Sequence, residues 1–412
     1  MANIRPVRGT HDLYGETIRR HRHVIDTGRD TARLYGYEEI ATPIFEFTEV
    51  FERSLGDTSD VVTKEMYTFE DRGGDSLTLR PENTASVARA VISGGMLQAL
   101  PLKLFYAGPM FRYERPQKGR LRQFHQIGVE LIGAPEPEGD VEVIAMGAQI
   151  LERLGIADKV TLEINTLGDP ESRIAYREQL VSYLQDFRDR LSEDSRQRLE
   201  RNPMRILDSK DEADRAIIRE APRLEEQLNQ ASLDFFQAVK DGLDELGIAY
   251  RLNDHLVRGL DYYTHTAFEF TTTALGAQGA VIAGGRYDGL VEEIGGPPTP
   301  GVGWAAGVER LALLATNEPA PPRPVAIIPI GSAAETEARK LAAELRHAGI
   351  AVELAFKGKP GQRMKRADRA HARFAISLGD EELKAGTVKL RDLDTKEEQT
   401  VDSREIPALL KR

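Results

Sequence analysis

The sequence contains no cysteine, which excludes disulfide bonds, thiolate zinc sites and cysteine nucleophiles together. It also lacks any run of about 18 consecutive apolar residues that could span a bilayer. The N-terminal residues MANIRPVRGTHDLYG lack the apolar segment of a secretory signal peptide. We therefore expect a cytoplasmic protein.

Positive charge is in deficit, because 55 Lys and Arg residues face 66 Asp and Glu residues, for a net charge of -11. A protein that coats nucleic acid depends on a basic surface, so any nucleic-acid contact here must use a local basic patch.

The Walker phosphate loop and a GxGxxG loop after a strand are also missing. If the protein binds ATP, it must use arginines and an antiparallel sheet.

The eight histidines show no spacing typical of a metal site. His21 and His23 lie two residues apart on a predicted helix, so their side chains should point in different directions. We expect no fixed metal site in the protein and no zinc.

The 412 residues are 41% hydrophobic and 29% charged, which is typical of a folded protein with more than one domain. Strand and helix patterns predict an N-terminal domain over 1–318, interrupted by a charged helical insertion over 170–247. The Pro-rich stretch 317–324 predicts a linker. Alternating strands and helices over 325–412 predict a separate α/β domain with a partly parallel sheet.

The stretch FRYERPQKGRLRQFHQIGVELIG predicts a hairpin of two strands, 102–114 and 126–132. Alternation gives the second strand an apolar face and a polar face, and the polar face carries Gln126, Gly128 and Glu130. A glycine inside a strand often marks a place where a ligand or another backbone lies close. The polar face therefore predicts a binding site for a small metabolite.

The loop of this hairpin carries four cations, Arg115, Lys118, Arg120 and Arg122. Guanidinium groups suit phosphate oxygens. A solvated basic hairpin is the alternative, and for a lone basic loop it is the favoured interpretation. The adjoining polar strand face favours a binding site instead.

A second arginine lies in LVRGLDYYTHTAFEF, where strand alternation puts Arg258, Leu260 and Tyr262 in one register. Taken alone, Arg258 could equally be a structural partner of Asp261 or Glu269. Two Gly-rich segments downstream, GGRYDGL and PGVGWAAGVERLALL, predict turns. The second turn leads into an apolar helix whose arginine, in the sequence GVERL, could meet a phosphate chain.

The chain resembles bacterial histidyl-tRNA synthetases in motifs that follow the family's order: VRGTHDLYG, TLRPENTA, FRYERPQKGRLRQFHQIGVELIG, LVRGLDYYT, GGRYDGL and GVGWAAGVERL. LVRGLDYYT resembles a signature of the histidine enzymes. The FRYE hairpin and the GVERL helix resemble motifs shared by class II aminoacyl-tRNA synthetases. GYEEIATP resembles the first class II motif, which in that family builds the dimer interface.

The resemblance implies an α+β fold with a class II antiparallel-sheet catalytic domain, a helical insertion and a C-terminal α/β anticodon-binding domain. It implies a histidine–tRNA ligase that forms histidyl-adenylate and pyrophosphate from L-histidine and ATP with Mg²⁺. The histidine would then pass to the 3′ end of histidine tRNA. We expect a homodimer with no membrane association and no organic cofactor.

The resemblance also assigns roles to residues by motif. Arg258 and Arg112 resemble the catalytic arginines. Expected histidine contacts are Glu82, Asn83, Thr84, Gln126, Glu130, Tyr262, Tyr263 and Tyr287. Expected ATP contacts are Arg112, Arg120, Phe124 and Arg310. Expected tRNA contacts are Gln117, Lys357, Arg363, Lys365 and Arg366.

The residue types suit this chemistry. A carboxylate that attacks the α-phosphorus brings two anions together, so fixed cations lower the barrier without proton transfer. Arg258→Lys should be poor because lysine lacks the guanidinium fork. An apolar amino acid would leave Glu130 unpaired, and sites of this kind discriminate by ~10⁴ or more, so no editing domain is needed. Asn83 stands where the family more often has glycine, a departure that could change the local turn.

The basic stretch KGKPGQRMKRADRAHAR in the last domain is the local patch that the charge deficit requires. A solvated helix face is the alternative, but the resemblance favours phosphate contacts with the anticodon stem.

A rival function is a catalytically idle paralogue that senses histidine as the regulatory subunit of a phosphoribosyltransferase. That family typically lacks the anticodon domain and the arginines that Arg112, Arg258 and Arg310 resemble here. A tRNA-binding sensor without chemistry is disfavoured by the same arginines.

Overall fold

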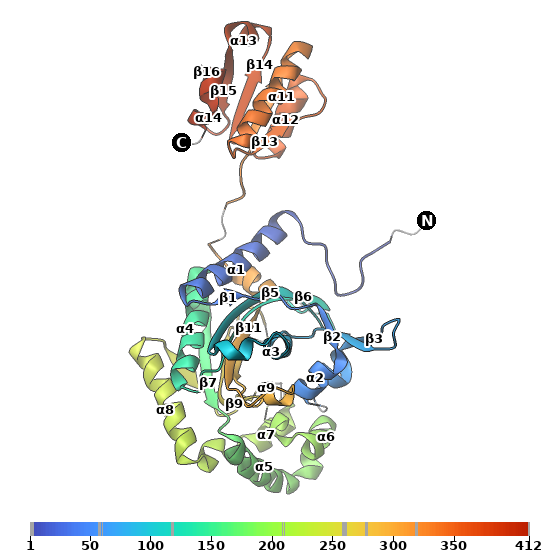
Figure 1. Cartoon of the computed structure of the whole chain (residues 1–412), viewed down its shortest axis with the longest axis vertical. Coiled ribbons are helices and arrows are strands. Elements are labelled where there is room, and N and C mark those ends of the chain that lie inside the picture. The colour runs from blue at the N-terminus through green and yellow to red at the C-terminus, as the bar shows by residue number, and fades with distance from the viewer. Residues whose placement is uncertain are drawn as a thin grey trace. The chain divides into compact units, whose positions relative to one another are not determined.

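The computed structural model describes residues 4–56, 59, 61–116, 119–207, 209, 211–257, 262–276, 279–317 and 320–410. The chain divides into two compact units, Met1–Pro319 and Ala320–Arg412 (Figure 1). Within the described residues, no helix has the length and apolar character needed to cross a membrane.

The first unit is built, over its described residues, on an eight-stranded sheet with the order β1-β5-β6-β11-β10-β9-β7-β8. Neighbours are antiparallel except for β1 with β5 and β7 with β8. This mostly antiparallel sheet with surrounding helices confirms the predicted α+β fold. The strands are β1 (Glu38–Glu39), β5 (Leu102–Phe111), β6 (Gln123–Ile132), β7 (Thr161–Thr166), β8 (Tyr250–Leu252), β9 (Thr264–Thr271), β10 (Ile282–Arg286) and β11 (Gly301–Gly307).

One face of the sheet is covered by α1 (Gly15–Leu34), α4 (Pro137–Arg153) and α10 (Val308–Leu314), and α8 (Gln230–Glu245) packs on α4. Alternation along β6 buries every second side chain against these helices. The side chains that β6 buries against these helices are Ile127, Val129 and Leu131. The apolar face predicted for this strand is therefore correct.

The opposite face packs against α2 (Thr48–Leu55), α3 (Thr84–Ser93) and α9 (Leu290–Glu293). A small sheet of β2 (Phe45–Phe47), β4 (Ser76–Leu79) and β3 (Tyr67–Glu70) leads into α3. The core on this side is rich in tyrosine, with Tyr106, Tyr176, Tyr262, Tyr263 and Tyr287.

A helical segment connects β7 to β8, with α5 (Pro170–Gln185), α6 (Glu193–Arg201) and α7 (Glu212–Ile218) before α8. Asp169 begins it, because its carboxylate accepts the Ser172 amide hydrogen at 2.8 Å and Pro170 follows. Figure 1 shows α5, α6 and α7 at the end of the first unit away from α1. The chain then returns to the same sheet, since β7 pairs with β8 and β9.

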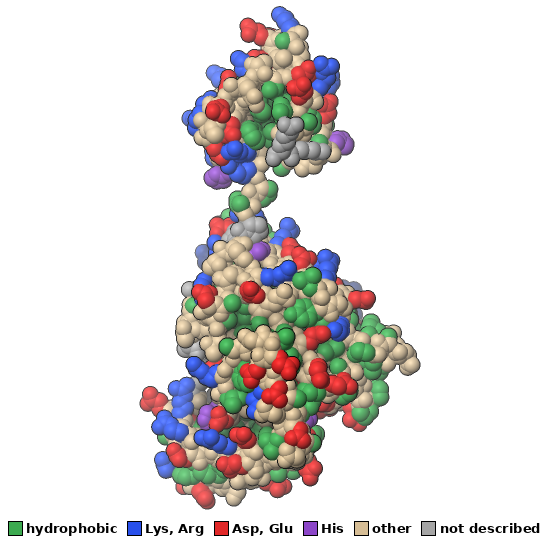
Figure 2. Space-filling model, turned by 90° about the vertical axis from the view of Figure 1, so that its left-hand side faces the viewer, with side chains coloured by type: hydrophobic (Ala, Val, Ile, Leu, Met, Phe, Trp, Pro, Cys, Tyr) green, Lys and Arg blue, Asp and Glu red, His purple; other side chains and the backbone are tan. Residues whose placement is uncertain are grey.

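The second unit has a five-stranded sheet over its described residues, with the order β13-β12-β14-β15-β16. Strands β12 (Val325–Pro329), β13 (Val352–Leu354) and β14 (Phe374–Leu378) are parallel, whereas β15 (Thr387–Asp392) and β16 (Glu398–Asp402) are antiparallel. The helices are α11 (Ser332–His347), α12 (Pro360–Arg369), α13 (Asp380–Ala385) and α14 (Ile406–Leu409). Figure 2 shows acidic and basic side chains interspersed on the face that it presents.

Two local expectations were wrong. β5 ends at Phe111, so Arg112 follows the strand instead of belonging to it. The segment Gly301–Gly307, predicted as a turn, is strand β11. Glycine is needed in it because a Cβ on Gly303 would lie 2.1 Å from Oε2 of Glu130.

Candidate active site

A cavity of about 300 Å³ opens on the sheet face opposite α1 and α4. Its wall combines the start of α3, the β5–β6 hairpin, the residues before β9, and the start of α10. Predicted site residues in the wall are Glu82, Thr84, Arg112, Arg120, Phe124, Gln126, Tyr262, Tyr263 and Arg310. Elements that are far apart in the sequence thus bring these side chains to one place.

Glu82 lies just before α3 and is 4% exposed. Its carboxylate accepts the amide hydrogens of Thr84 and Ala85, at 2.7 and 2.9 Å. Burial raises the pKa of Glu82, while these hydrogen bonds and the Arg112 charge act in the opposite direction. Across the cavity wall, Oε1 of Gln126 is buried and has no hydrogen-bond partner among the described residues. A ligand group that donates hydrogen bonds, such as an ammonium group, would satisfy both the Glu82 carboxylate and the Gln126 carbonyl oxygen.

Asn83 faces away from the cavity. Its Oδ1 accepts hydrogen bonds from Thr42 Oγ1 at 2.8 Å and from the Arg80 guanidinium at 3.0 Å. The side chain therefore shapes the turn between Glu82 and Thr84, and it is not among the side chains that line the cavity, where we predicted a histidine contact.

Glu130 lies behind the cavity wall and is 1% exposed. Thr84 Oγ1 donates to its Oε1 at 2.8 Å, and the Tyr287 hydroxyl donates to its Oε2. Burial raises the pKa of Glu130 to about 8. The protein thus holds a carboxyl group that keeps its proton near neutral pH and is oriented by two hydroxyl groups.

Gly128 lies between Gln126 and Glu130 on β6, where the sequence predicted that a ligand or another backbone lies close. A Cβ at Gly128 would lie 2.3 Å from both Cζ and the hydroxyl oxygen of Tyr106. The space beside the glycine is therefore occupied by Tyr106 and by the Trp304 carbonyl, which lies 2.7 Å from the same position. Of the two predicted neighbours, another backbone lies close to Gly128, and the protein's own tyrosine occupies the space expected for a ligand.

Three arginines converge on the other end of the cavity. Arg112 is anchored by a hydrogen bond from its Nε to the Pro81 carbonyl, at 2.8 Å, and its guanidinium lies 5.5 Å from the centre of the Phe124 ring. Arg120 donates to Glu114 at 3.1 Å. Burial lowers the pKa of Arg310, and the nearby Arg120 charge adds to this effect. Crowded cations on a partly buried surface suit a polyanion such as a triphosphate.

Tyr262 and Tyr263 pack with their ring centres 4.6 Å apart, and the edge of Tyr262 meets Tyr287. Both residues precede β9, which begins at Thr264, so the strand alternation predicted from Arg258 to Tyr262 does not apply to them. Arg258 and Gln117 lie outside the described residues.

The predicted tRNA contacts in the second unit fall into two groups. Lys357, Lys365 and Arg366 are exposed on or beside α12. Arg363 is 7% exposed, and it donates to the Gly358 carbonyl and to Glu335, each at 2.8 Å. Arg363 therefore holds the start of α12 in place and is poorly placed for phosphate.

The sequence prediction missed a fully buried ion pair, Arg286 with Asp140. The Arg286 guanidinium also donates to the Ala134 carbonyl at 2.9 Å. The pair joins the end of β10 to α4, next to Tyr287. Arg286 was visible in GGRYDGL, but no local pattern points to a partner in another helix.

A mostly antiparallel sheet that carries an arginine-lined cavity next to a buried polar pocket is the catalytic architecture of class II aminoacyl-tRNA synthetases. Residues 9–311 match the family model described as histidyl-tRNA synthetase, and residues 324–412 match an anticodon binding domain. The chain belongs to the histidyl-tRNA synthetase family.

Named relatives agree with this assignment. The chain is 63% identical over 402 residues to a histidine–tRNA ligase of Rhodospirillum rubrum, covering 97% of both chains. It is 58% identical over 394 residues to that of Gluconacetobacter diazotrophicus, covering 96% of this chain and 95% of the relative. The apo crystal structure of S. aureus histidyl-tRNA synthetase matches with a TM-score of 0.84 and 38% identity, covering 100% of each chain.

Proposed function

We propose that this protein is a histidine–tRNA ligase that activates L-histidine with ATP and transfers it to the 3′ end of histidine tRNA. One observation carries the proposal: a single cavity joins converging arginines to a polar pocket backed by the buried Glu130. The arginines suit a triphosphate, and the pocket suits a small polar side chain. The regulatory-subunit alternative is not favoured, because the relatives named as ligases are so similar over nearly the whole chain.

In the first step, a histidine carboxylate oxygen attacks the α-phosphorus of ATP, and the bond to pyrophosphate breaks. The amino group of histidine would lie between Glu82 and Gln126, and its imidazole would point toward Glu130 and Tyr263. Arg112 would hold the α-phosphate, with Arg258 as its proposed partner in stabilising the developing charge. In the second step, a ribose hydroxyl of the tRNA attacks the activated carbonyl and AMP leaves.

Mg²⁺ would enter as part of the ATP substrate. Glu114 and Glu269 in the cavity wall offer carboxylate oxygens, the ligand type that Mg²⁺ prefers besides phosphate. The ion would neutralise phosphate charge that the arginines do not reach.

The second unit is proposed to bind the anticodon region of histidine tRNA through Lys357, Lys365 and Arg366.

We also propose that the protein is a cytoplasmic homodimer. The small sheet that follows GYEEIATP exposes Phe45, Phe47 and Phe69, at 48%, 54% and 46%. Exposed aromatic side chains grouped in this way are typical of a protein interface.

The test is histidine-dependent exchange of pyrophosphate into ATP, with the other amino acids as controls, followed by charging of histidine tRNA. Histidine alone should support exchange. A folded dimer without exchange would contradict the proposal.

A further inference from the structure

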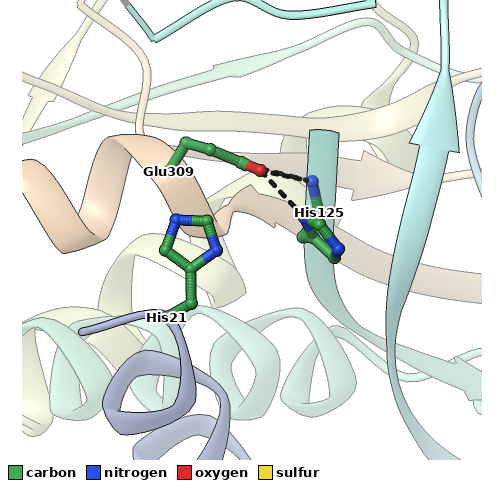
Figure 3. Close-up of side chains that lie close together, drawn as sticks. All are labelled: His21, His125 and Glu309. Atoms are coloured by element: carbon green, nitrogen blue, oxygen red, sulfur yellow. Dashed lines mark hydrogen bonds and ion pairs between the residues drawn. The ribbon is translucent and has the colours of Figure 1, made fainter. Parts of the chain in front are cut away.

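Three side chains from distant parts of the sequence meet behind the cavity: His21 of α1, His125 of β6 and Glu309 at the start of α10, which also lines the cavity (Figure 3). One ligand atom from each lies within 4.8 Å of the others. His125 shares the alternation of Ile127 and Val129, so it faces α1 and α10 behind the sheet. The cluster is therefore separate from the polar face of β6.

His21 is 5% exposed, and its Nδ1 has no hydrogen-bond partner within the described part of the chain. Its ring points into the space beside Glu309 and His125 (Figure 3). A buried imidazole nitrogen without a hydrogen-bond partner costs free energy, unless a ligand interacts with it.

Glu309 fixes the second imidazole. Its carboxylate accepts the backbone amide hydrogen of His125, at 2.9 and 3.0 Å, and contacts Nδ1 of the same ring at 2.9 Å. The His125 ring is therefore held in one orientation against Glu309, so two of the three donor groups are already in contact.

We propose that His21, His125 and Glu309 form a site for one Zn²⁺ ion that joins α1, β6 and α10. Two imidazoles and one carboxylate are a common protein ligand set for zinc. Ligand atoms around a tetrahedral zinc lie roughly 3.3 Å apart, given bonds of about 2.0–2.1 Å. Small side-chain rotations would close the present spacing to that value.

A cavity of about 680 Å³ lies beside His21 and Glu309 and gives the ion a path from solvent. His11 and Asp12 line the same cavity, so either of them or a water molecule could complete the coordination. Mg²⁺ is excluded by its preference for oxygen ligands in octahedral geometry.

The test uses the full-length chain after removal of metals. Isothermal titration should show one tight Zn²⁺ per chain, and the melting temperature should rise with Zn²⁺ but not with Mg²⁺. Co²⁺ in place of zinc should give the strong visible absorption of a tetrahedral site. His21→Gln should weaken Zn²⁺ affinity by at least about 100-fold, since loss of outer partners alone costs 10–100-fold.

The matched control is His23→Gln, two residues along the same helix, which should leave Zn²⁺ affinity unchanged. Equal affinity in wild type and His21→Gln would overturn the proposal, as would an equal loss in both variants. If His21→Gln does not fold, anomalous diffraction at the zinc edge from wild-type crystals decides. An ion between the three side chains supports the site, and no ion there overturns it.

Discussion

Tyr287 donates its hydroxyl hydrogen to Glu130, a residue 157 positions earlier in the chain, and both side chains are 1% exposed. The other carboxyl oxygen of Glu130 accepts a hydrogen bond from the Thr84 hydroxyl. Glu130 is thus oriented on one side by the residue that follows β10 and on the other by the first residue of α3. Its position depends on elements that the sequence separates widely.

Tyr287→Phe removes one of these two donors and should loosen the polar pocket. A buried polar group left without its partner costs about 1–3 kcal/mol, so we expect KM for histidine to rise roughly 5- to 100-fold. KM for ATP should stay nearly constant, because Tyr287 is not among the residues that line the cavity with Arg112 and Arg310. Pyrophosphate exchange measures both values. Tyr250→Phe, which removes a hydroxyl near the exposed Asp244, is the control, and an equal change in KM for ATP would contradict the assignment.

Glu130→Gln should change how stability depends on pH. The pKa of Glu130 is about 8 in the folded protein against a reference value of 4.5, so the folded state holds the extra proton between these values. Stability contributed by this proton is therefore full at low pH and is lost as pH rises through that window. The glutamine variant has no carboxyl group at this position and therefore does not lose this stability. As pH rises from 4.5 to about 8, its free energy of unfolding relative to that of wild type should increase by up to about 5 kcal/mol. Urea unfolding of both proteins at several pH values measures the difference, and parallel pH profiles would show that Glu130 has an ordinary pKa.

Arg112→Lys keeps the positive charge but loses both the fork and the Nε hydrogen bond to Pro81. Loss of one preorganised donor to a developing oxyanion typically costs about 10²–10³ in kcat, and we expect a loss of this size in pyrophosphate exchange. The control is Arg122→Lys on the same hairpin, where the guanidinium stacks on Tyr113 at 3.8 Å. Similar activity in the two variants would refute the role of Arg112.

Gly128→Ala should destabilise the first unit, because the new methyl group would overlap Tyr106 and would lie 2.7 Å from the Trp304 carbonyl. Overpacking of this kind costs typically about 1–3 kcal/mol. Gly289→Ala is the control, since its Cβ would meet only Glu293 at an ordinary 3.8 Å. Urea unfolding compares the two variants. A stable Gly128→Ala protein would mean that Tyr106 can move away.

Lys365→Ala and Arg363→Ala should separate binding from stability in α12. Lys365 is exposed, so its loss should weaken tRNA binding and lower the slope of log affinity against log salt by about 1, without a change in melting temperature. Arg363 is buried and paired with Glu335, so its loss should lower the melting temperature of the second unit. Salt-dependent tRNA binding and calorimetry measure these effects. A normal salt slope in Lys365→Ala would remove it from the tRNA contacts.

Sequence patterns predicted those features that depend on local periodicity or on motifs. The period of two in β6 correctly separated Ile127 and Val129 from Gln126 and Glu130, because one sheet face packs against helices. Patterns failed where a residue's surroundings come from elsewhere in the chain. Gly128 makes room for Tyr106 of the neighbouring strand, and nothing in the sequence of β6 indicates that occupant.

Charge alone was equally insufficient in the second unit. The basic stretch around α12 looks uniform in sequence, yet Arg363 is buried against Glu335 while Lys365 faces solvent. Helical position decides this difference, and Glu335 lies in another helix, α11. The cluster of His21, His125 and Glu309 escaped detection for the same reason, since only the fold brings its members together.

Glu82 has a further consequence for which molecules the enzyme rejects. Two amide hydrogens at the start of α3 already stabilise its anion, so the acceptor exists before substrate arrives. If Glu82 holds the amino group as proposed, a deaminated analogue such as imidazolepropionate would leave this buried carboxylate without its ammonium partner, at a cost of several kcal/mol. Metabolites that carry the imidazole ring but lack the amino group would then bind weakly. Glu82 would cause this discrimination although it does not contact the ring.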